Sequence, residues 1–286
     1  DLLGPAVSYF CQQRKIPYVV EPMGMYFPID RSFRLKYLWH RTIGKSYLRN
    51  AVRMVATSEM EEQELLQSGM SPARVILRYN GIDPDSFACQ QPRGEFRARY
   101  GISPEEPLIL FLGRLIPRKG ADILIESFAE VCPGSGRLVI AGPEGERGYS
   151  ARLEKRAESC GVASRVIFTG PLYGRDKQSV FADTDVFALP SRYENFANSA
   201  AEAIAGEIPV IITDACGIRS LVEGRAGLVI SPGKESLTQA LRTILSNRAL
   251  YLQLKAGCLD VAAQLSWDRL TEQMEGYYFD LLGRRA

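Results

Sequence analysis

Two segments of the sequence combine basic, acidic and small residues in an order that suits a diphosphate ligand. In the first, residues 113–120, Arg114 and Lys119 lie between two glycines and follow the apolar run 108–112. In open α/β sheets, ligands bind beyond the carboxyl ends of the strands, and cations held there can bind phosphate oxygens. This segment alone fits a diphosphate-binding loop and a solvated basic loop equally well.

The second segment, residues 190–202, also follows an apolar run and leads into an alanine-rich stretch. It predicts a helix that begins near 197–199, whose free N–H groups and positive dipole end would favour the same anionic ligand. Glu194 precedes this helix and Glu202 lies about one turn inside it. A carboxylate beside a diphosphate is repelled unless it binds something else, so we expect the pair to bind ribose or sugar hydroxyl groups. Taken singly, each glutamate is more simply a solvated surface charge.

The two carboxylates also suggest the acid and the nucleophile of a glycosidase. Retaining glycosidases hold these two carboxyl groups about 5 to 5.5 Å apart. Eight residues of helix span about 12 Å, so the hydrolase interpretation is disfavoured. A third segment, residues 142–145, follows an apolar run but lacks the G-x-G-x-x-G pattern and carries Pro143, so it is interpreted as a turn at a strand end.

Short β-branched runs alternate with amphipathic stretches along the whole chain. Runs that are apolar on both faces and separated by helices are typical of parallel sheets covered on each side. The predicted fold class is therefore α/β, with doubly wound parallel sheets. The predicted strands are 17–21, 52–57, 75–79, 108–112, 138–141, 166–169, 186–189, 210–213 and 228–230.

Composition excludes several classes of protein. The 286 residues have room for about two domains, and a net charge of +2 gives no overall basic field for nucleic acid. No apolar run approaches the roughly 18 residues of a membrane span. The six cysteines show no two-residue spacing and the chain has one histidine, so we expect no metal site, and reduced thiols in a cytoplasmic protein.

Turn and linker residues between 80 and 107 suggest a domain boundary. Residues 1–80 hold only two or three of the predicted strands, too few for a comfortable sheet, so this first unit looks incomplete. Residues 81–265 hold six and look like a complete domain. Residues 266–286 predict a closing helix that packs back toward the first domain. The chain does not begin with Met, so it looks like a piece of a longer protein.

Taken in order, these segments resemble the retaining glycosyltransferases of family 4, which have the GT-B architecture of two facing Rossmann-like domains. The resemblance implies that residues 1–80 are the C-terminal part of an N-terminal, acceptor-side Rossmann-like domain that is truncated in this chain, and that residues 81–265 are the C-terminal, nucleotide-sugar donor-binding Rossmann-like domain. The resemblance implies transfer of a sugar from a UDP-, GDP- or ADP-linked donor to an acceptor hydroxyl with the anomeric configuration kept, without a cofactor or metal. The matching motifs are Asn80-Gly81-Ile82-Asp83, Gly113-Arg114 with Lys119-Gly120, Val139-Ile140-Ala141-Gly142, Val166-Ile167-Phe168-Thr169-Gly170, Glu194 with Glu202 as an E-x7-E pair, Gly206-Glu207-Ile208-Pro209-Val210, and Ser266-Trp267.

The resemblance also implies a role for each matched residue. Arg114 and Lys119 would bind the donor diphosphate and stabilise the leaving group, which makes them catalytic candidates together with Glu194 at the transferred sugar. Glu202 would hold the ribose hydroxyls. The other donor-binding candidates are Gly113, the backbone around Phe196, Ala197, Asn198 and Ser199, and the loop with Pro171 and Leu172 near the base.

Two departures from the family pattern stand out. The usual Glu-Gly-Phe-Gly is Glu194-Asn195-Phe196-Ala197 here, which modifies the close backbone approach that glycine permits. The strands expected before Asp1, with a glycine-rich loop and a histidine-bearing strand end, are missing. Met23 stands at a Pro-x-Gly position where relatives often carry histidine, and His40 is interpreted as a surface residue.

Residues 31–53 contain basic and aromatic residues and no acidic residue. Such a stretch can lie on an anionic membrane, which would suit a lipid-linked acceptor at the inner face of the cytoplasmic membrane. Alternatively, its apolar residues pack on the sheet, or its cations line an acceptor cleft. The function predicted is glycosyl transfer in cell-surface polysaccharide or lipid-linked glycan synthesis. The alternatives are a non-catalytic nucleotide-sugar-binding fragment or partner subunit and, less favoured, a nucleotide-sugar epimerase.

Overall fold

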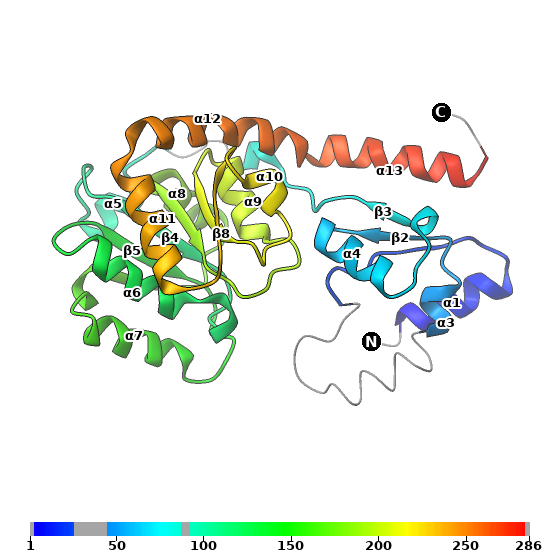
Figure 1. The fold of residues 1–286 in the computed structure, drawn as a ribbon, viewed down its shortest axis with the longest axis horizontal. Helices are drawn as coiled ribbons and strands as arrows, with labels where there is room; N and C mark the ends of the chain where they lie inside the picture. The colour runs from blue at the N-terminus through cyan, green and yellow to red at the C-terminus, as the bar shows by residue number, and fades with distance from the viewer. Residues whose placement is uncertain (1–2, 26–44, 87–91, 284–286) are drawn as a thin grey trace. The chain divides into compact units, whose positions relative to one another are not determined.

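The computed structural model describes residues 3–25, 45–86 and 92–283. All nine predicted strands lie within these residues and are present, with ends that differ from the prediction by at most two residues. The chain divides into two compact units, Asp1–Asn80 and Gly81–Ala286. Each unit contains one parallel sheet, which confirms the predicted fold class (Figure 1).

The larger unit is built on six parallel strands in the order β6-β5-β4-β7-β8-β9. The chain runs outward from β4 through β5 to β6, returns to β7 on the other side of β4, and continues outward to β9. This is the Rossmann order, and its switch point lies between β4 and β7, which pair through Ile109–Val186 and Leu110–Phe187. The strands are β4 (Leu108–Leu112), β5 (Arg137–Ala141), β6 (Val166–Gly170), β7 (Val186–Leu189), β8 (Val210–Thr213) and β9 (Gly227–Ile230).

Helices cover both faces of this sheet. Helix α6 packs against α7 and α11, whereas α9 packs against α12, and α5 packs against α8 (Figure 1). The central strand β4 is fully buried from Leu108 to Phe111, as its uninterrupted apolar sequence predicts. The helices are α5 (Glu95–Tyr100), α6 (Ala121–Val131), α7 (Tyr149–Ser159), α8 (Gly174–Asp183), α9 (Asn198–Ala205), α10 (Arg219–Val222), α11 (Lys234–Ser246), α12 (Arg248–Gln264) and α13 (Trp267–Leu281).

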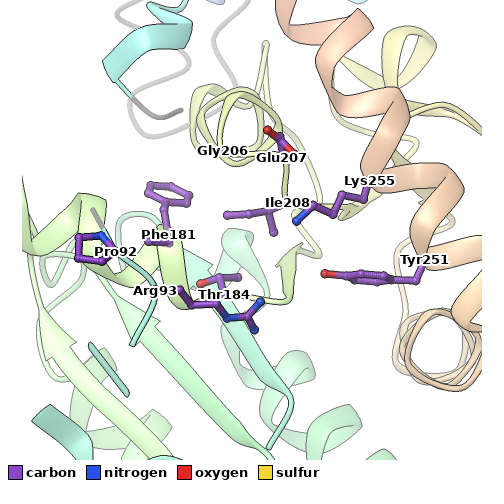
Figure 2. A pocket seen from close by; sticks show the side chains of 10 residues that line it. Pro92, Arg93, Phe181, Thr184, Gly206, Glu207, Ile208, Tyr251 and Lys255 are labelled. Atoms are coloured by element: carbon purple, nitrogen blue, oxygen red, sulfur yellow. The ribbon is translucent and has the colours of Figure 1, made fainter. Parts of the chain in front are cut away.

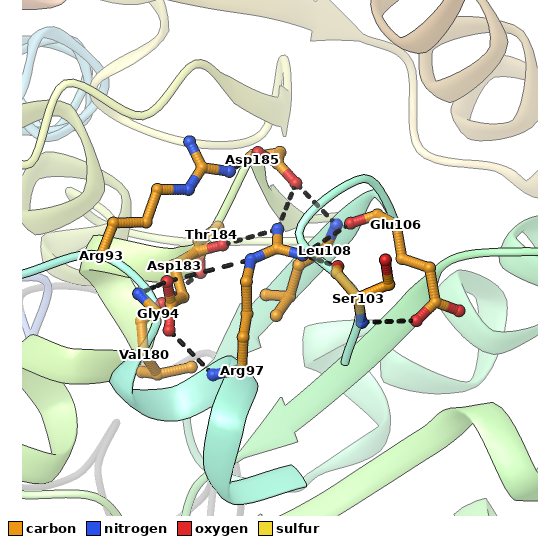
Figure 3. Close-up of polar contacts among 10 residues, drawn as sticks. All are labelled: Arg93, Gly94, Arg97, Ser103, Glu106, Leu108, Val180, Asp183, Thr184 and Asp185. Atoms are coloured by element: carbon orange, nitrogen blue, oxygen red, sulfur yellow. Dashed lines mark hydrogen bonds and ion pairs between the residues drawn. The ribbon is translucent and has the colours of Figure 1, made fainter. Parts of the chain in front are cut away.

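A buried arginine ties together the elements at the amino-terminal edge of this sheet (Figure 3). Arg97 of α5 is 3% exposed. Its guanidinium donates to the backbone oxygens of Ser103, Glu106 and Asp183 at 2.8, 2.8 and 3.0 Å and to a carboxylate oxygen of Asp185 at 2.7 Å. The buried charge is tolerated because it is paired and hydrogen-bonded.

The final helix is joined to the segment that opens the larger unit. Ser266 caps α13 by accepting a hydrogen bond from the Arg269 N–H at 3.4 Å. The Ile82 N–H donates to the Leu265 oxygen at 2.8 Å, and the Trp267 N–H donates to the Ile82 oxygen at 3.1 Å. None of the described helices combines the length and the apolar character needed to cross a membrane.

The smaller unit has three parallel strands in the order β1-β2-β3. The buried side chain of Glu61 accepts hydrogen bonds from the Thr57 N–H and hydroxyl, both at 2.8 Å, and from the Gly24 N–H at 2.5 Å. This carboxylate thus holds the turn after β1 against the start of α4. The elements are α1 (Leu3–Gln13), β1 (Val19–Val20), α3 (Lys45–Arg49), β2 (Arg53–Ala56), α4 (Glu59–Gln67) and β3 (Val75–Leu77).

Only part of the basic and aromatic stretch 31–53 is described. In that part, Leu48 is buried and Tyr47 packs against the core of the smaller unit. The rings of Tyr47 and Tyr18 stack with centroids 6.4 Å apart. Residues 31–44, with His40, lie outside the described residues.

Candidate functional site

The two predicted loops leave the sheet side by side, because they follow β4 and β7 at the switch point. The Arg192 N–H donates to the Arg118 oxygen at 2.9 Å, so the loops are hydrogen-bonded to each other. Gly120 has φ +75°, and a Cβ there would lie 2.4 Å from the Pro190 oxygen. Glycine is therefore required where the first loop passes the second.

The turn after β5 supports the first loop from its other side. The Leu115 N–H donates to the Pro143 oxygen at 2.9 Å, and the Gly145 N–H donates to the Leu115 oxygen at 3.1 Å. Gly142 has φ +145°, and a Cβ on it would lie 1.9 Å from the Gly113 oxygen. The segment interpreted as a turn at a strand end thus positions the predicted diphosphate loop.

Lys119 and Glu194 form an ion pair between the two loops. Lys119 Nζ lies 2.5 Å from Glu194 Oε1, and each side chain is 13% exposed. The Ser191 hydroxyl donates to the same carboxylate oxygen at 2.9 Å. The backbone of Glu194 is fixed as well, since its N–H donates to the Ala215 oxygen at 2.9 Å and its carbonyl accepts from the Gly217 N–H at 3.0 Å.

Helix α9 begins at Asn198, within the predicted range. Its N-cap is Ala197, whose φ of +81° and ψ of +59° place it in the left-handed region. Phe196 and Ala197 are buried, whereas Asn198 is exposed and Ser199 is half-buried. The helix start therefore follows Glu194 directly, and its dipole adds positive potential beside Lys119.

Glu202 forms a second ion pair with a lysine that the sequence interpretation did not select. Lys177 Nζ of α8 lies 2.8 Å from Glu202 Oε1, and each side chain is 21% exposed. Neither Glu194 nor Glu202 is a solvated surface charge, so that alternative is wrong. Each carboxylate pairs with its own lysine from a different element, which is unlike the two facing carboxyl groups of a retaining glycosidase.

Arg114 contrasts with these paired groups. Its side chain is exposed, and it makes no hydrogen bond or ion pair with the residues that the structure describes. In the same loop, the Arg118 guanidinium lies 5.9 Å from the centroid of the Tyr193 ring. Of the three cations in the loop, Lys119 is ion-paired, Arg118 contacts the Tyr193 ring and Arg114 faces solvent.

The loop with Pro171 and Leu172 is less closely tied to the other predicted residues. Pro171 is exposed and Leu172 is half-buried, and the loop leads directly into α8. Its link to the rest of the site is Lys177 in that helix. A signal for Lys177 was present in the sequence: a lysine one turn before Val180 and Phe181 stands on the apolar side of an amphipathic helix.

Cys216 pairs with Glu194 through an isolated β-bridge and is completely buried. Burial raises the pKa of its thiol to about 11, and the charge of Glu194 acts in the same direction. The thiol is therefore neutral at physiological pH and has no nucleophilic thiolate. The described cysteines are free: Cys11, Cys132, Cys160, Cys216 and Cys258.

A cavity of about 270 Å³ lies elsewhere in the larger unit (Figure 2). It is lined by residues that include Arg93, Phe181, Ile208, Tyr251 and Lys255. Phe181 lies near the end of α8, Ile208 precedes β8, and Tyr251 and Lys255 belong to α12. The cavity is therefore at the end of the sheet where the strands begin, away from the carboxyl ends of β4 and β7, and none of the predicted site residues lines it. In the part of the chain that the structure describes, no group of three or more His, Cys, Asp or Glu residues is arranged to hold a metal ion.

The fold and the loop geometry define a member of a known enzyme family. The model of the family described as glycosyl transferases group 1 matches residues 92–257, more than half of the chain. The chain therefore belongs to the glycosyl transferases group 1 family, as the sequence motifs predicted.

Two curated relatives show how much of a family member the chain spans. It is 30% identical over 260 residues to a D-inositol 3-phosphate glycosyltransferase of Stackebrandtia nassauensis, covering 86% of this chain and 58% of that protein. It is 32% identical over 241 residues to the enzyme of the same name from Xylanimonas cellulosilytica, covering 81% of this chain and 58% of that protein. The chain thus spans less than two thirds of these relatives.

Solved structures share the fold at lower identity. The structure of Anabaena Alr3699/HepE in complex with UDP and glucose superposes with a TM-score of 0.82 at 23% identity, covering 95% of this chain and 73% of that one. Sucrose-phosphate synthase from Thermosynechococcus elongatus gives a TM-score of 0.79 at 24% identity, covering 96% of this chain and 71% of that one. These likenesses establish the two-sheet α/β fold of the GT-B glycosyltransferases.

Proposed function

We propose that this chain forms the donor-binding part of a retaining glycosyltransferase, together with a portion of its acceptor-side domain. The enzyme would transfer a sugar from a nucleotide-sugar donor to an acceptor hydroxyl. The observation that carries the proposal is the Lys119–Glu194 pair, which lies at the switch point of a Rossmann sheet and beside the start of α9. Family membership and a fold neighbour solved with UDP and glucose support it.

The proposed chemistry follows from where charge develops. Breaking the bond between a sugar and a nucleoside diphosphate leaves growing negative charge on the diphosphate. Arg114, Lys119 and the N-terminus of α9 would stabilise that charge. Each well-placed donor of this kind lowers the activation free energy by about 3 kcal/mol. Glu194 would contact the sugar, and Glu202 the ribose. In this proposal the acceptor hydroxyl attacks the face from which the diphosphate departs, which keeps the anomeric configuration.

The acceptor side of the proposal depends on the kinds of protein that the chain resembles. A fold neighbour, WaaG, is described as a glycosyltransferase involved in lipopolysaccharide biosynthesis, and its TM-score is 0.71. We infer a glycan or lipid-linked acceptor and a role in cell-surface polysaccharide synthesis at the cytoplasmic side of the membrane. Peripheral membrane contact through residues 31–53 stays a prediction, which sedimentation with anionic liposomes at low salt tests.

Calorimetric titration of the chain with UDP, GDP and ADP tests the donor site. Saturable binding of one nucleotide is expected, and Arg114→Ala and Glu202→Ala should each weaken it. Lys155→Ala, in the exposed part of α7, is the control and should bind like the wild type. Absence of binding to all three nucleotides by the folded protein would contradict the proposal.

The second candidate is a non-catalytic nucleotide-sugar-binding fragment or partner subunit. The larger unit holds both ion pairs of the predicted donor site, and nucleotide-sugar binding without transfer requires no more than that site. Incubation with the nucleotide sugar of the base that binds separates the two candidates. Transfer or slow donor hydrolysis that is lost in Arg114→Ala supports the enzyme, whereas binding without turnover supports the binding module.

A further inference from the structure

The ion pair between Lys177 and Glu202 joins two helices of the larger unit, with Nζ 2.8 Å from Oε1. Helix α8, which carries Lys177, follows the loop predicted to lie near the base. Helix α9, which carries Glu202, begins where the phosphate groups are predicted to bind. The pair therefore connects the two helices that would hold opposite ends of a nucleoside diphosphate.

Helix α8 places a lysine, Lys177, on the side that also carries buried apolar residues. Val180 and Phe181, one turn further along α8, are buried in the core, and Lys177 shares their side of the helix. Placing a lysine there costs desolvation and side-chain entropy, which an apolar residue would avoid. The ion pair with Glu202 offsets part of this cost.

The contact has a defined effect on the Glu202 carboxylate. Lys177 binds Oε1, while Oε2 makes no hydrogen bond or ion pair with the residues that the structure describes. An ion pair at one oxygen restricts the side-chain rotamer and leaves the other oxygen available to hydroxyl donors. The ammonium group also offsets a negative charge that would otherwise repel a nearby diphosphate.

We propose that Lys177 is a positioning residue of the donor site, which orients the Glu202 carboxylate toward the adjacent 2′- and 3′-hydroxyl groups of the ribose. In this way it makes the site prefer ribonucleoside diphosphates to their deoxy counterparts. The inference rests on the proposed function, because it requires that Glu202 binds the ribose. Lys177 need not touch the nucleotide itself.

The test compares one nucleoside diphosphate with an analogue that lacks both ribose hydroxyl groups. The diphosphate that binds best among UDP, GDP and ADP is titrated in parallel with its 2′,3′-dideoxy form. The proteins are the wild type, Lys177→Met, Lys177→Arg, Glu202→Gln and the double variant of Lys177→Met with Glu202→Gln. Arg175→Met is the matched control, because Arg175 is an exposed cation of the same helix, paired with Glu95 at 3.1 Å. Thermal melts check that all variants fold.

The wild type should bind the ribonucleotide about tenfold or more tightly than the dideoxy form, because hydroxyl groups bonded to a carboxylate are charge-assisted donors. Lys177→Met should reduce this ratio severalfold and leave the affinity for the dideoxy form within about twofold of the wild type. Lys177→Arg should restore part of the ratio. In the double variant, Lys177→Met should add nothing to the effect of Glu202→Gln.

Four results would overturn the inference. If Lys177→Met keeps the wild-type ratio, Lys177 does not position Glu202. If it weakens both nucleotides equally, also in the Glu202→Gln background, Lys177 contacts the diphosphate or only supports the fold. If Glu202→Gln keeps the wild-type ratio, or if no nucleotide binds, the proposed ribose role itself is wrong and the inference falls with it.

Discussion

Lys119 Nζ lies 2.5 Å from Glu194 Oε1, and this contact joins the loop after β4 to the loop after β7. The cation proposed for the donor diphosphate is thus held by the carboxylate proposed for the donor sugar. Both side chains are largely shielded from water, so their attraction is stronger than that of a surface pair. A bound diphosphate must compete with Glu194 for Lys119.

This competition predicts that Glu194→Gln tightens the binding of a free nucleoside diphosphate. The substitution keeps the shape of the side chain and removes the charge that occupies Lys119. We expect Kd to fall by about fivefold, which corresponds to about 1 kcal/mol. Calorimetry with the best-binding diphosphate measures the change, while turnover of the full nucleotide sugar should decline because the sugar contact is altered. Unchanged or weaker diphosphate binding would show that Glu194 does not compete.

The reciprocal substitution, Lys119→Met, should have the opposite effect on the same ligand. It removes one charge-assisted contact to the diphosphate, so binding should weaken by about tenfold or more. The glutamate left without its lysine keeps a hydrogen bond from Ser191, and the protein should still fold. Binding that is insensitive to this substitution would argue against a diphosphate at this loop.

Ala197 predicts a gain in stability on substitution by glycine. Its φ of +81° lies in the left-handed region, which costs an alanine about 1 to 2 kcal/mol. Glycine removes this cost. It also gives the unfolded chain more conformational freedom, which lowers the free energy of unfolding by about 0.4 to 1 kcal/mol. Ala197→Gly should therefore raise the free energy of unfolding by about 0.5 to 1 kcal/mol, measured by urea denaturation. A decrease would mean that the Cβ makes compensating contacts.

The buried arginine of α5 predicts a large loss of stability. Arg97→Met removes the guanidinium donor from three backbone oxygens and one of the donors of the Asp185 carboxylate, which keeps the contacts from Arg93 and the Leu108 N–H. We expect a destabilisation of about 3 to 5 kcal/mol. Arg99→Met, which removes an exposed cation paired with Asp176 at 2.8 Å, should leave the urea midpoint nearly unchanged. Similar midpoints for the two variants would refute the structural role of Arg97.

Much of the fold could be predicted because its signals are local. Strands such as Leu108–Leu112 and Val210–Thr213 are continuous apolar runs, and burial on both faces requires that pattern. The start of α13 could also be predicted, because the capping residue Ser266 is a local signal. The strand order needed more than local pattern, since it depends on which strand the chain returns to after β6.

The neighbouring positions of the loops after β4 and β7 could be predicted from the sequence, but the ion pairs could not. A motif does not state which lysine meets which glutamate, and the roles of Arg114, Lys119, Glu194 and Glu202 stay predictions. Those contacts depend on tertiary packing between segments far apart in sequence, as in Lys177 with Glu202. The left-handed backbone conformation of Ala197 could not be predicted from the sequence either, because alanine rarely adopts it.

The buried thiol of Cys216 predicts how the larger unit responds to alkaline pH. The pKa of this thiol is raised to about 11, mainly by burial, whereas an unfolded cysteine ionises near pH 8.5. The unfolded state therefore loses its proton first, so the stability held by the neutral thiol is complete below about pH 8.5 and declines up to about pH 11.

In the Cys216→Ala variant, the free energy of unfolding should fall less steeply between about pH 8.5 and 11, by up to about 1.4 kcal/mol per pH unit. At neutral pH the variant should be less stable than the wild type, because the substitution leaves a cavity. Urea denaturation of the wild type and of Cys216→Ala at pH 7.5, 9 and 10.5 measures the difference. The gap between the two proteins should narrow as the pH rises. A gap that is constant across the three pH values would show that Cys216 ionises as it does in the unfolded chain.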